Sequence, residues 1–179
     1  MKDIIRIHYY ESPCGEFKLI LGSYQDQLCM CDWQIESRRR IIDKRILKAL
    51  KTDYLIERSE VIEKAILQLD EYFNKIRTTF DIPLLFTGTD FQKTVWNKLL
   101  EIPYGTTESY MGLSKQLNNP KAIRAVAAAN GANPISIFVP CHRIIGSNNT
   151  LVGYGGGLPN KKKLLELELS IHGQQLELF

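Results

Sequence analysis

Residues 109–131, SYMGLSKQLNNPKAIRAVAAANG, contain the pattern that decides the fold. A short helix is predicted over 109–117, and a second helix is predicted from Pro120 after a tight turn. Asn119 is a favourable N-cap, Pro120 a favourable first helical residue and Gly131 a favourable C-terminal stop. Two short helices joined by a tight turn are typical of a helix-turn-helix.

The second of these helices is unusual in its small side chains. Alanine occupies positions 122, 125, 127, 128 and 129, and Arg124 is the only long charged side chain after the first turn. A smooth helix can approach another surface closely. The alternative is that the alanines pack against a neighbouring helix, and this segment alone leaves both interpretations open.

The first half of the chain has the pattern of strands followed by helices. Apolar and polar residues alternate over 5–10, and two further strands are predicted over 17–21 and 28–33. Apolar residues at helical spacing predict helices over 38–50 and 59–77, the second with Ile76 on its apolar face. Residues 81–88 break the helical pattern and are the best candidate linker.

The tetrapeptide Pro140-Cys141-His142-Arg143 is the strongest candidate for chemistry. It follows the apolar run 135–139, which predicts a buried strand ending at the cysteine. A cysteine there is either inert core or a nucleophile activated by a base or a positive field, which His142 and Arg143 could supply.

The last helix, predicted over 159–171, contains a carboxylate that could interact with His142. Glu168 lies among leucines, and a buried carboxylate without a partner would be costly, so His142 is a reasonable partner for it. The alternative places Glu168 on the solvated side, beside the lysines at 161–163. The glycine-rich segment 153–157 lacks a P-loop ending and is not predicted to bind nucleotide phosphate.

Composition limits the classes of protein. The chain has 179 residues and a net charge of +3, which is too small to establish a nucleic-acid partner. It has no apolar run of membrane-spanning length and no secretory signal, so we expect a cytoplasmic protein with free thiols. Cys29, Cys31 and His8 form only a weak zinc pattern, and no metal site is predicted.

An ordered series of motifs in the second half resembles the O6-alkylguanine-DNA alkyltransferases, also called methylated-DNA–protein-cysteine methyltransferases. The motifs are Phe91-Gln92-x3-Trp96, Ile102-Pro103-Tyr104-Gly105-Thr106, Ser109-Tyr110, Asn119-Pro120-Lys121-Ala122-x-Arg124-Ala125-Val126, Asn130-Gly131-x-Asn133-Pro134, Pro140-Cys141-His142-Arg143, Gly153-Tyr154-x-Gly156-Gly157-Leu158 and Leu164-Leu165-x2-Glu168. The first half is similar more weakly, through Ser12-Pro13-x-Gly15 and the approach to Pro83.

The resemblance implies an α+β fold of two domains. Residues 1–86 would form a small, ribonuclease-H-like α/β domain, and residues 87–179 a winged-helix-like domain with the helix-turn-helix. The implied activity is DNA repair by direct damage reversal. An alkyl group of O6-alkylguanine in double-stranded DNA would pass irreversibly to Cys141 in a single turnover, and O4-methylthymine is a second candidate substrate.

The resemblance also implies roles for individual residues. Cys141 would be the nucleophile, His142 its base acting through a water, and Glu168 the carboxylate that holds His142. Asn133 would brace the turn before the active-site segment, and Tyr110 would donate a proton to the guanine.

Other residues match the base pocket and the DNA contacts of that family. With the helix in the minor groove, Arg124 would enter the base stack and fill the gap left by the flipped base. The base pocket would contain Tyr154, Gly155, Ile144 and Asn130, and the DNA backbone would meet Gln92, Asn119 and Ser147. No metal or other cofactor is implied, and the protein would act as a monomer.

Two alternatives belong to other classes of protein. A non-catalytic lesion sensor related to the alkyltransferases would bind damaged DNA without transfer, but such proteins replace the nucleophile that Cys141 provides here. A cysteine hydrolase using Cys141, His142 and Glu168 would turn over repeatedly and would leave the helix-turn-helix unexplained.

Overall fold

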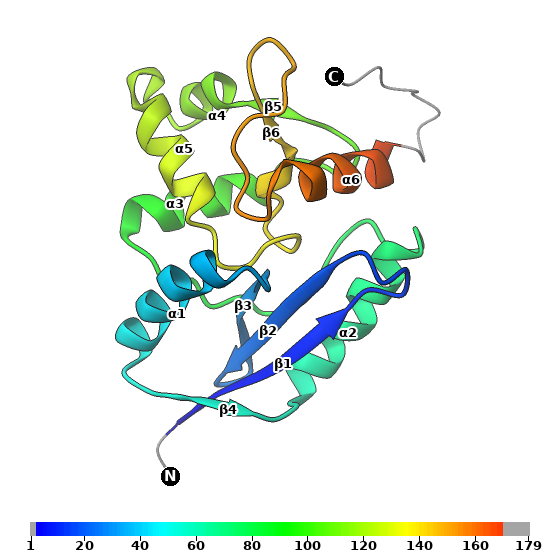
Figure 1. Cartoon of the computed structure of the whole chain (residues 1–179). Coiled ribbons are helices and arrows are strands. Elements are labelled where there is room, and N and C mark those ends of the chain that lie inside the picture. Colours follow the sequence, from blue (N-terminus) through cyan, green and yellow to red (C-terminus); the bar gives the residue numbers. More distant parts are fainter. Residues whose placement is uncertain (1–2, 170–179) are drawn as a thin grey trace. The chain divides into compact units, whose positions relative to one another are not determined.

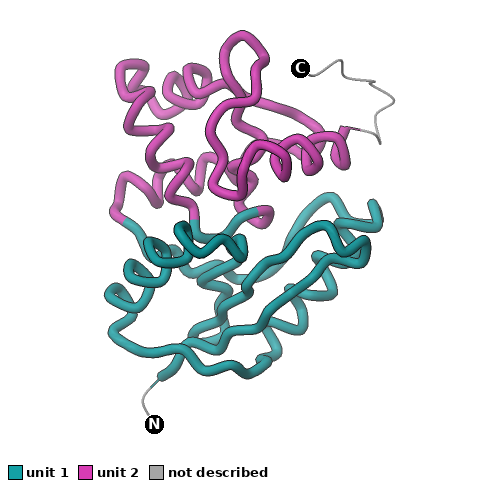
Figure 2. The backbone as a smooth tube through the Cα atoms, in the orientation of Figure 1, with its two compact units in different colours: residues 1–88, 134–136 teal, residues 89–133, 137–179 magenta. Residues whose placement is uncertain are grey.

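The computed structural model describes residues 3–169, which belong to two compact units (Figure 2). Unit 1 comprises residues 1–88 and 134–136, and unit 2 comprises residues 89–133 and 137–179. The sequence did not indicate that the segment 134–136 belongs to the first unit. The domain boundary between residues 86 and 87 stays a prediction.

Unit 1 is built on a four-stranded mixed sheet. Its strands are β1 (Ile5–Glu11), β2 (Lys18–Tyr24), β3 (Gln27–Trp33) and β4 (Tyr54–Ile56), in the order β3-β2-β1-β4. β2 is antiparallel to both β1 and β3, whereas β4 is parallel to β1. Gln25 and Asp26 both have positive φ, as a two-residue hairpin turn requires.

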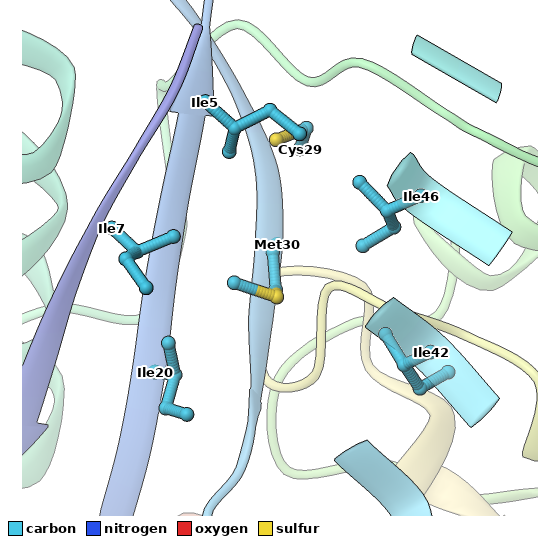
Figure 3. Close-up of a cluster of buried hydrophobic side chains, with 7 residues drawn as sticks. All are labelled: Ile5, Ile7, Ile20, Cys29, Met30, Ile42 and Ile46. Atoms are coloured by element: carbon cyan, nitrogen blue, oxygen red, sulfur yellow. The ribbon is translucent and has the colours of Figure 1, made fainter. Parts of the chain in front are cut away.

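Two helices cover opposite faces of this sheet (Figure 1). Ile5 and Ile7 of β1 pack with Ile42 and Ile46 of helix α1 (Glu36–Leu50) in one buried cluster (Figure 3). Tyr10 points to the other face, because side chains alternate along a strand, and its ring stacks on Phe73 of helix α2 (Glu60–Phe73).

The outer edge of β3 is covered by two short segments of chain. Leu28 forms a parallel bridge with Leu84, and Cys31 forms one with Ile135. The Cys31 backbone N–H donates to the Pro134 carbonyl at 3.0 Å, and the Ser136 N–H donates to the Cys31 carbonyl at 2.6 Å. An edge strand covered in this way presents fewer unpaired backbone groups to other chains.

Unit 2 is mainly helical. Its elements are α3 (Asp90–Leu99), β5 (Glu108–Ser109), α4 (Tyr110–Gln116), the 3-10 helix η1 (Pro120–Ala122), α5 (Ile123–Gly131), the 3-10 helix η2 (Cys141–Arg143), β6 (Ile144–Ile145) and α6 (Leu158–Leu169). β5 and β6 pair in parallel. Thr89 and Gln92 form a capping box at the start of α3, and Trp96 Nε1 donates to the Ala129 carbonyl of α5 at 2.8 Å.

The predicted α+β class is confirmed, and so are the two short helices α4 and α5. Pro120 as the first helical residue and the end of the second helix at Gly131 are confirmed, whereas the predicted N-cap role of Asn119 was wrong. Asn119 makes no side-chain cap and is followed by η1, so α5 begins only at Ile123. Gly131 is the last residue of the helix rather than a left-handed stop.

The strand predicted over 135–139 was also wrong. The run forms isolated bridges instead of a ladder, among them Ile135 with Cys31, and Ile137 has φ of +72°, which no regular strand adopts. The chain therefore turns before Cys141, which begins η2. The apolar residues 135–139 are buried in the core although they form a turn. The spacing of apolar residues in the sequence cannot distinguish a buried turn from a buried strand.

The helix predicted over 59–77 ends earlier than expected. α2 stops at Phe73, Lys75 has φ of +61°, and Ile76 is exposed instead of lying on the apolar face. The predicted end of the last helix, at Ile171, lies outside the described residues. In the part of the chain that the structure describes, no helix is long and apolar enough to span a membrane.

Candidate active site

Cys141 is buried at the start of η2, with 3% of its surface exposed. Asn133 Nδ2 donates to its Sγ atom at 3.1 Å and to the Val139 carbonyl at 2.9 Å. The amide therefore ties the thiol to the turn that precedes it. A donor aimed at Sγ stabilises negative charge on the sulfur, since hydrogen bonds to ionised acceptors are stronger than neutral ones.

Behind the thiol lies a buried network centred on one carboxylate. Glu168 Oε1 lies 2.7 Å from His142 Nε2, which is the contact predicted from the sequence. Arg143 donates to both oxygens of Glu168, from Nε at 2.9 Å and from NH2 at 3.0 Å. The Gly105 N–H donates to Oε2 at 3.2 Å, so the carboxylate accepts from four donors.

The contacts define the charges in this network. Burial alone would raise the pKa of Glu168, but His142 and Arg143 outweigh it and hold the pKa well below its usual range. Burial lowers the pKa of His142 despite the neighbouring carboxylate. At neutral pH, Glu168 and Arg143 therefore form a charged pair beside a neutral imidazole.

These charges also fix the tautomer of His142. An ionised carboxylate only accepts hydrogen bonds, so Nε2 carries the imidazole proton and Nδ1 keeps its lone pair. Nδ1 is buried and has no hydrogen-bond partner among the described residues. His142 is thus arranged as a base at Nδ1, with Glu168 as the group that orients it.

Arg143 has further partners that the sequence did not indicate. Its NH1 donates to the Ile102 carbonyl at 2.6 Å, and its guanidinium lies 5.7 Å from the centre of the Tyr104 ring. The planar guanidinium matches the carboxylate in two parallel hydrogen bonds. Arg143 therefore neutralises Glu168 and connects α6 to the segment after α3.

Lys161 is a buried residue that sequence reasoning missed. It is fully buried on α6, and its Nζ donates to the Ile144 carbonyl at 2.5 Å and to the Val152 carbonyl at 2.7 Å. Burial lowers the pKa of Lys161 to about 8. The signal was its spacing of three, four and seven residues from Leu164, Leu165 and Glu168, which places it on the buried stripe of the helix.

Tyr110 and Asn130 lie near the other side of the cysteine. Asn130 Nδ2 donates to the Cys141 carbonyl at 3.3 Å. Burial raises the pKa of Tyr110, a hydrogen bond from Asn130 works against that rise, and Cys141 adds to it. Tyr110 therefore keeps its phenolic proton at neutral pH and can donate it.

The predicted pocket residues lie in the same unit. Ile144 is buried, and its carbonyl accepts from Lys161. Tyr154 and Gly155 are half-buried in the segment before α6. An added Cβ at Gly153 would lie 3.8 Å from the Tyr110 hydroxyl, so the glycine-rich segment passes close to that side chain.

The predicted DNA-contact residues are also in unit 2. Arg124 on α5 is exposed and has no ion pair among the described residues. Asn119 and Ser147 are exposed as well. Gln92 is half-buried, and its Oε1 accepts from the Thr89 N–H in the capping box, so its amide nitrogen is the group left for another partner.

The weak zinc pattern has no geometric support. Among residues 3–169, no group of three or more His, Cys, Asp or Glu side chains is arranged to hold a metal ion. Cys29 Sγ donates to the Gly22 carbonyl at 3.4 Å, and burial raises the pKa of this thiol to about 12. Cys29 is therefore a protonated core residue.

Comparisons with known proteins cover both units. The DNA-binding domain of the 6-O-methylguanine DNA methyltransferase family matches residues 90–170, and its ribonuclease-like domain matches residues 5–86. A methylated-DNA–protein-cysteine methyltransferase of Methanosarcina acetivorans is 51% identical over 116 residues, which are 65% of this chain and 74% of the relative. One of Methanosarcina barkeri is 48% identical over 158 residues, 88% and 93% of the two chains.

Solved structures agree with this assignment. The crystal structure of Mycobacterium tuberculosis OGT in complex with DNA has a TM-score of 0.77 and 39% identity, and the match covers 92% of this chain and 93% of the other. A buried cysteine beside a histidine–glutamate pair, in a unit with a helix-turn-helix, defines a class of cysteine-dependent DNA-binding proteins. Within it, this chain belongs to the 6-O-methylguanine DNA methyltransferase family.

Proposed function

We propose that this protein repairs DNA by transferring the alkyl group of O6-alkylguanine to Cys141. The observation that carries the proposal is the buried Sγ atom, which accepts from Asn133 and is followed directly by the neutral imidazole that Glu168 orients. The membership of the family supports the same reaction. O4-methylthymine is the second candidate substrate.

In the proposed reaction, the proton of Cys141 passes through a water to Nδ1 of His142. The sulfur then attacks the alkyl carbon, the bond from that carbon to O6 breaks, and its electron pair leaves with the guanine. Tyr110 supplies the proton that neutralises the departing base. Asn133 stabilises the sulfur while it is charged, and no cofactor takes part because the lesion is the alkyl donor.

The product is a thioether, which water does not cleave under ordinary conditions because it has no activated carbonyl. Each molecule therefore acts once. Repeated turnover, as in a cysteine hydrolase, would need an acyl intermediate that this substrate cannot form.

The proposed partner is double-stranded DNA. The protein would bind it as a monomer, with α4 and α5 in the minor groove. The target base must leave the stack to reach a buried sulfur, which costs a few kcal/mol. Arg124 would lower that cost by filling the gap, and Gln92, Asn119 and Ser147 would hold the backbone. Tyr154, Gly155, Ile144 and Asn130 would surround the flipped base. The cytoplasmic location and the domain division at residues 86 and 87 stay predictions.

The experiment is a transfer assay read by mass spectrometry. The protein is incubated with a duplex containing O6-methylguanine and digested with trypsin, which releases the peptide from Ala125 to Arg143. We expect this peptide to gain one methyl group, with the gain saturating at one per protein molecule. Cys141→Ser is the control and gains none.

An unmodified peptide after full exposure would refute the proposal. Tight lesion binding without transfer would instead identify a lesion sensor, and more than one guanine repaired per protein molecule would contradict single turnover.

A further inference from the structure

Helix α1 of unit 1 carries a concentration of positive charge that the proposed function does not use. Residues 36–51 contain seven Lys and Arg and two Asp and Glu, a net charge of +5, whereas the whole chain has +3. More than the entire excess of positive charge therefore lies on one helix and its C-cap residue, outside the unit that contains Cys141.

Part of this charge serves the fold. Arg38 Nε lies 2.6 Å from Oδ1 of the fully buried Asp32, and Arg39 pairs with Asp32 and with Asp43. Both arginine side chains are largely buried, at 12% and 11% exposure. These arginines hold α1 to strand β3 and are not available to an external partner.

Of the five remaining basic residues, Arg45 is half-buried and the other four form a line on the outer face. Arg40, Lys44, Lys48 and Lys51 are all exposed, and we call them the basic stripe. At about 100° per residue, Arg40, Lys44 and Lys48 fall within about 80° of one another around the helix, and Lys51 follows as its C-cap. Arg40 pairs with Glu36. The three lysines have no ion pair within 4.0 Å among the described residues.

Such a line of charge has a cost for the isolated protein. Lys44 and Lys48, like Arg40 and Lys44, are like charges four residues apart, which destabilise a helix. A helix face that contacts only solvent does not need its lysines in line, and acidic residues can stand between them. The stripe therefore fits a partner with a line of negative charge.

We propose that the basic stripe of α1 binds the phosphate backbone of DNA and is a second, lesion-independent contact. Side chains four residues apart on a helix lie about 5–6 Å apart, so flexible lysines there can reach successive phosphates of one strand. The choice of DNA among polyanions rests on the proposed function. The stripe has no aromatic side chain and would read no sequence.

The test compares three lysine variants. In the first, Lys44, Lys48 and Lys51 are changed to Gln. In the second, the same residues are changed to Arg, which keeps the charge. The matched control changes Lys18, Lys64 and Lys75 of unit 1 to Gln, since these lysines are exposed and lie outside α1. Lys75 matches Lys51 because both have positive φ.

The measurement is the Kd for an unmodified duplex, by fluorescence anisotropy from about 50 to about 200 mM NaCl. Each phosphate contact contributes about 0.9 to the slope of log Kd against log salt, so the glutamine variant should lose about 2.7 from that slope. Its affinity deficit should grow about sixfold for each halving of the salt concentration. The arginine variant and the control should keep the original slope.

An unchanged slope in the glutamine variant, or an equal loss in the control, would overturn the proposal. Alkyl transfer from free O6-benzylguanine to Cys141 separates the two proposals, because this small substrate needs no DNA contact. We expect the glutamine variant to react with it at the original rate, which also shows that the variant is folded. Failure of the native protein to take a methyl group from the O6-methylguanine duplex would refute the proposed function, whereas the salt dependence would still decide whether the basic stripe binds DNA.

Discussion

Replacing Glu168 with glutamine removes one charge from the buried network and keeps the length of the side chain. In the native chain, Oε1 accepts from His142 and Arg143, and Oε2 accepts from Arg143 and Gly105. A glutamine amide has one oxygen and one NH2 group, so in either orientation two of the four donors face another donor. The Arg143 guanidinium also loses its counter-charge while its side chain stays only 7% exposed.

The expected cost follows from this geometry. Removing one partner of a buried ion pair typically costs about 3–5 kcal/mol, because the other charge is left uncompensated. That is a large share of the about 5–15 kcal/mol that stabilises a folded domain. For a chain of this size, Tm falls by about 2–4 °C per kcal/mol, so we expect Glu168→Gln to lower it by about 6–20 °C.

The assay is thermal unfolding followed by circular dichroism, with Glu166→Gln as the control. Glu166 lies on the same helix, is 59% exposed and pairs only loosely with Lys162 at 3.8 Å, so its loss should cost less than about 1 kcal/mol. At a temperature where both variants are folded, only Glu168→Gln should slow the reaction with O6-benzylguanine. Equal Tm values for the two variants would show that Glu168 and Arg143 are not the stabilising pair described above.

Three further predictions test other parts of the site. Arg124→Ala should slow repair of a duplex and leave the reaction with free O6-benzylguanine unchanged, with Lys121→Ala as the control; equal losses on both substrates would exclude a role in base flipping. Asn133→Ala should slow alkylation of Cys141 by about 10- to 100-fold, which is the equivalent of one charge-assisted hydrogen bond. The rate is measured by quenching the reaction with O6-benzylguanine at successive times. Asn149→Ala is the control, and equal rates for the two variants would refute the contact between Asn133 and Cys141. Burial lowers the pKa of Lys161 from 10.5 to about 8, so the unfolded chain binds more protons between these values and stability should rise by up to about 3 kcal/mol as pH increases through this range. Urea unfolding at both ends of the range should show this rise in the native chain, and its persistence in Lys161→Met would assign it to another group.

The sequence predicted the elements whose residues follow a regular period. The strands β1, β2 and β3 and the helices α1 and α2 begin close to where alternation or helical spacing placed them, because each buries one face against the core. β4 and β5 are only 3 and 2 residues long and give no such signal. The segment 135–139 was predicted as a strand because it is apolar, but its residues are buried in a turn with positive φ at Ile137.

The candidate site was predictable where the chemistry was local. Cys141 and His142 are adjacent in the sequence, and Glu168 was found because a carboxylate among leucines needs a partner. Lys161 was missed because it stands first in a run of three lysines, which normally indicates a solvated surface. Its carbonyl partners belong to the two-residue strand β6 and to the irregular segment after it, neither of which has a sequence signal.

The short segment 134–136 has a consequence for how the protein can be divided. It follows Asn133, which holds the thiol, yet it completes the edge of the sheet beside Cys31. Cutting the chain at residue 88 would leave Ile135 without its strand neighbour and would expose backbone groups that are now paired. A fragment that begins after residue 88 would contain every chemical group of the proposed reaction. It would still lack strand β3, which holds the segment 134–136 between Asn133 and Cys141.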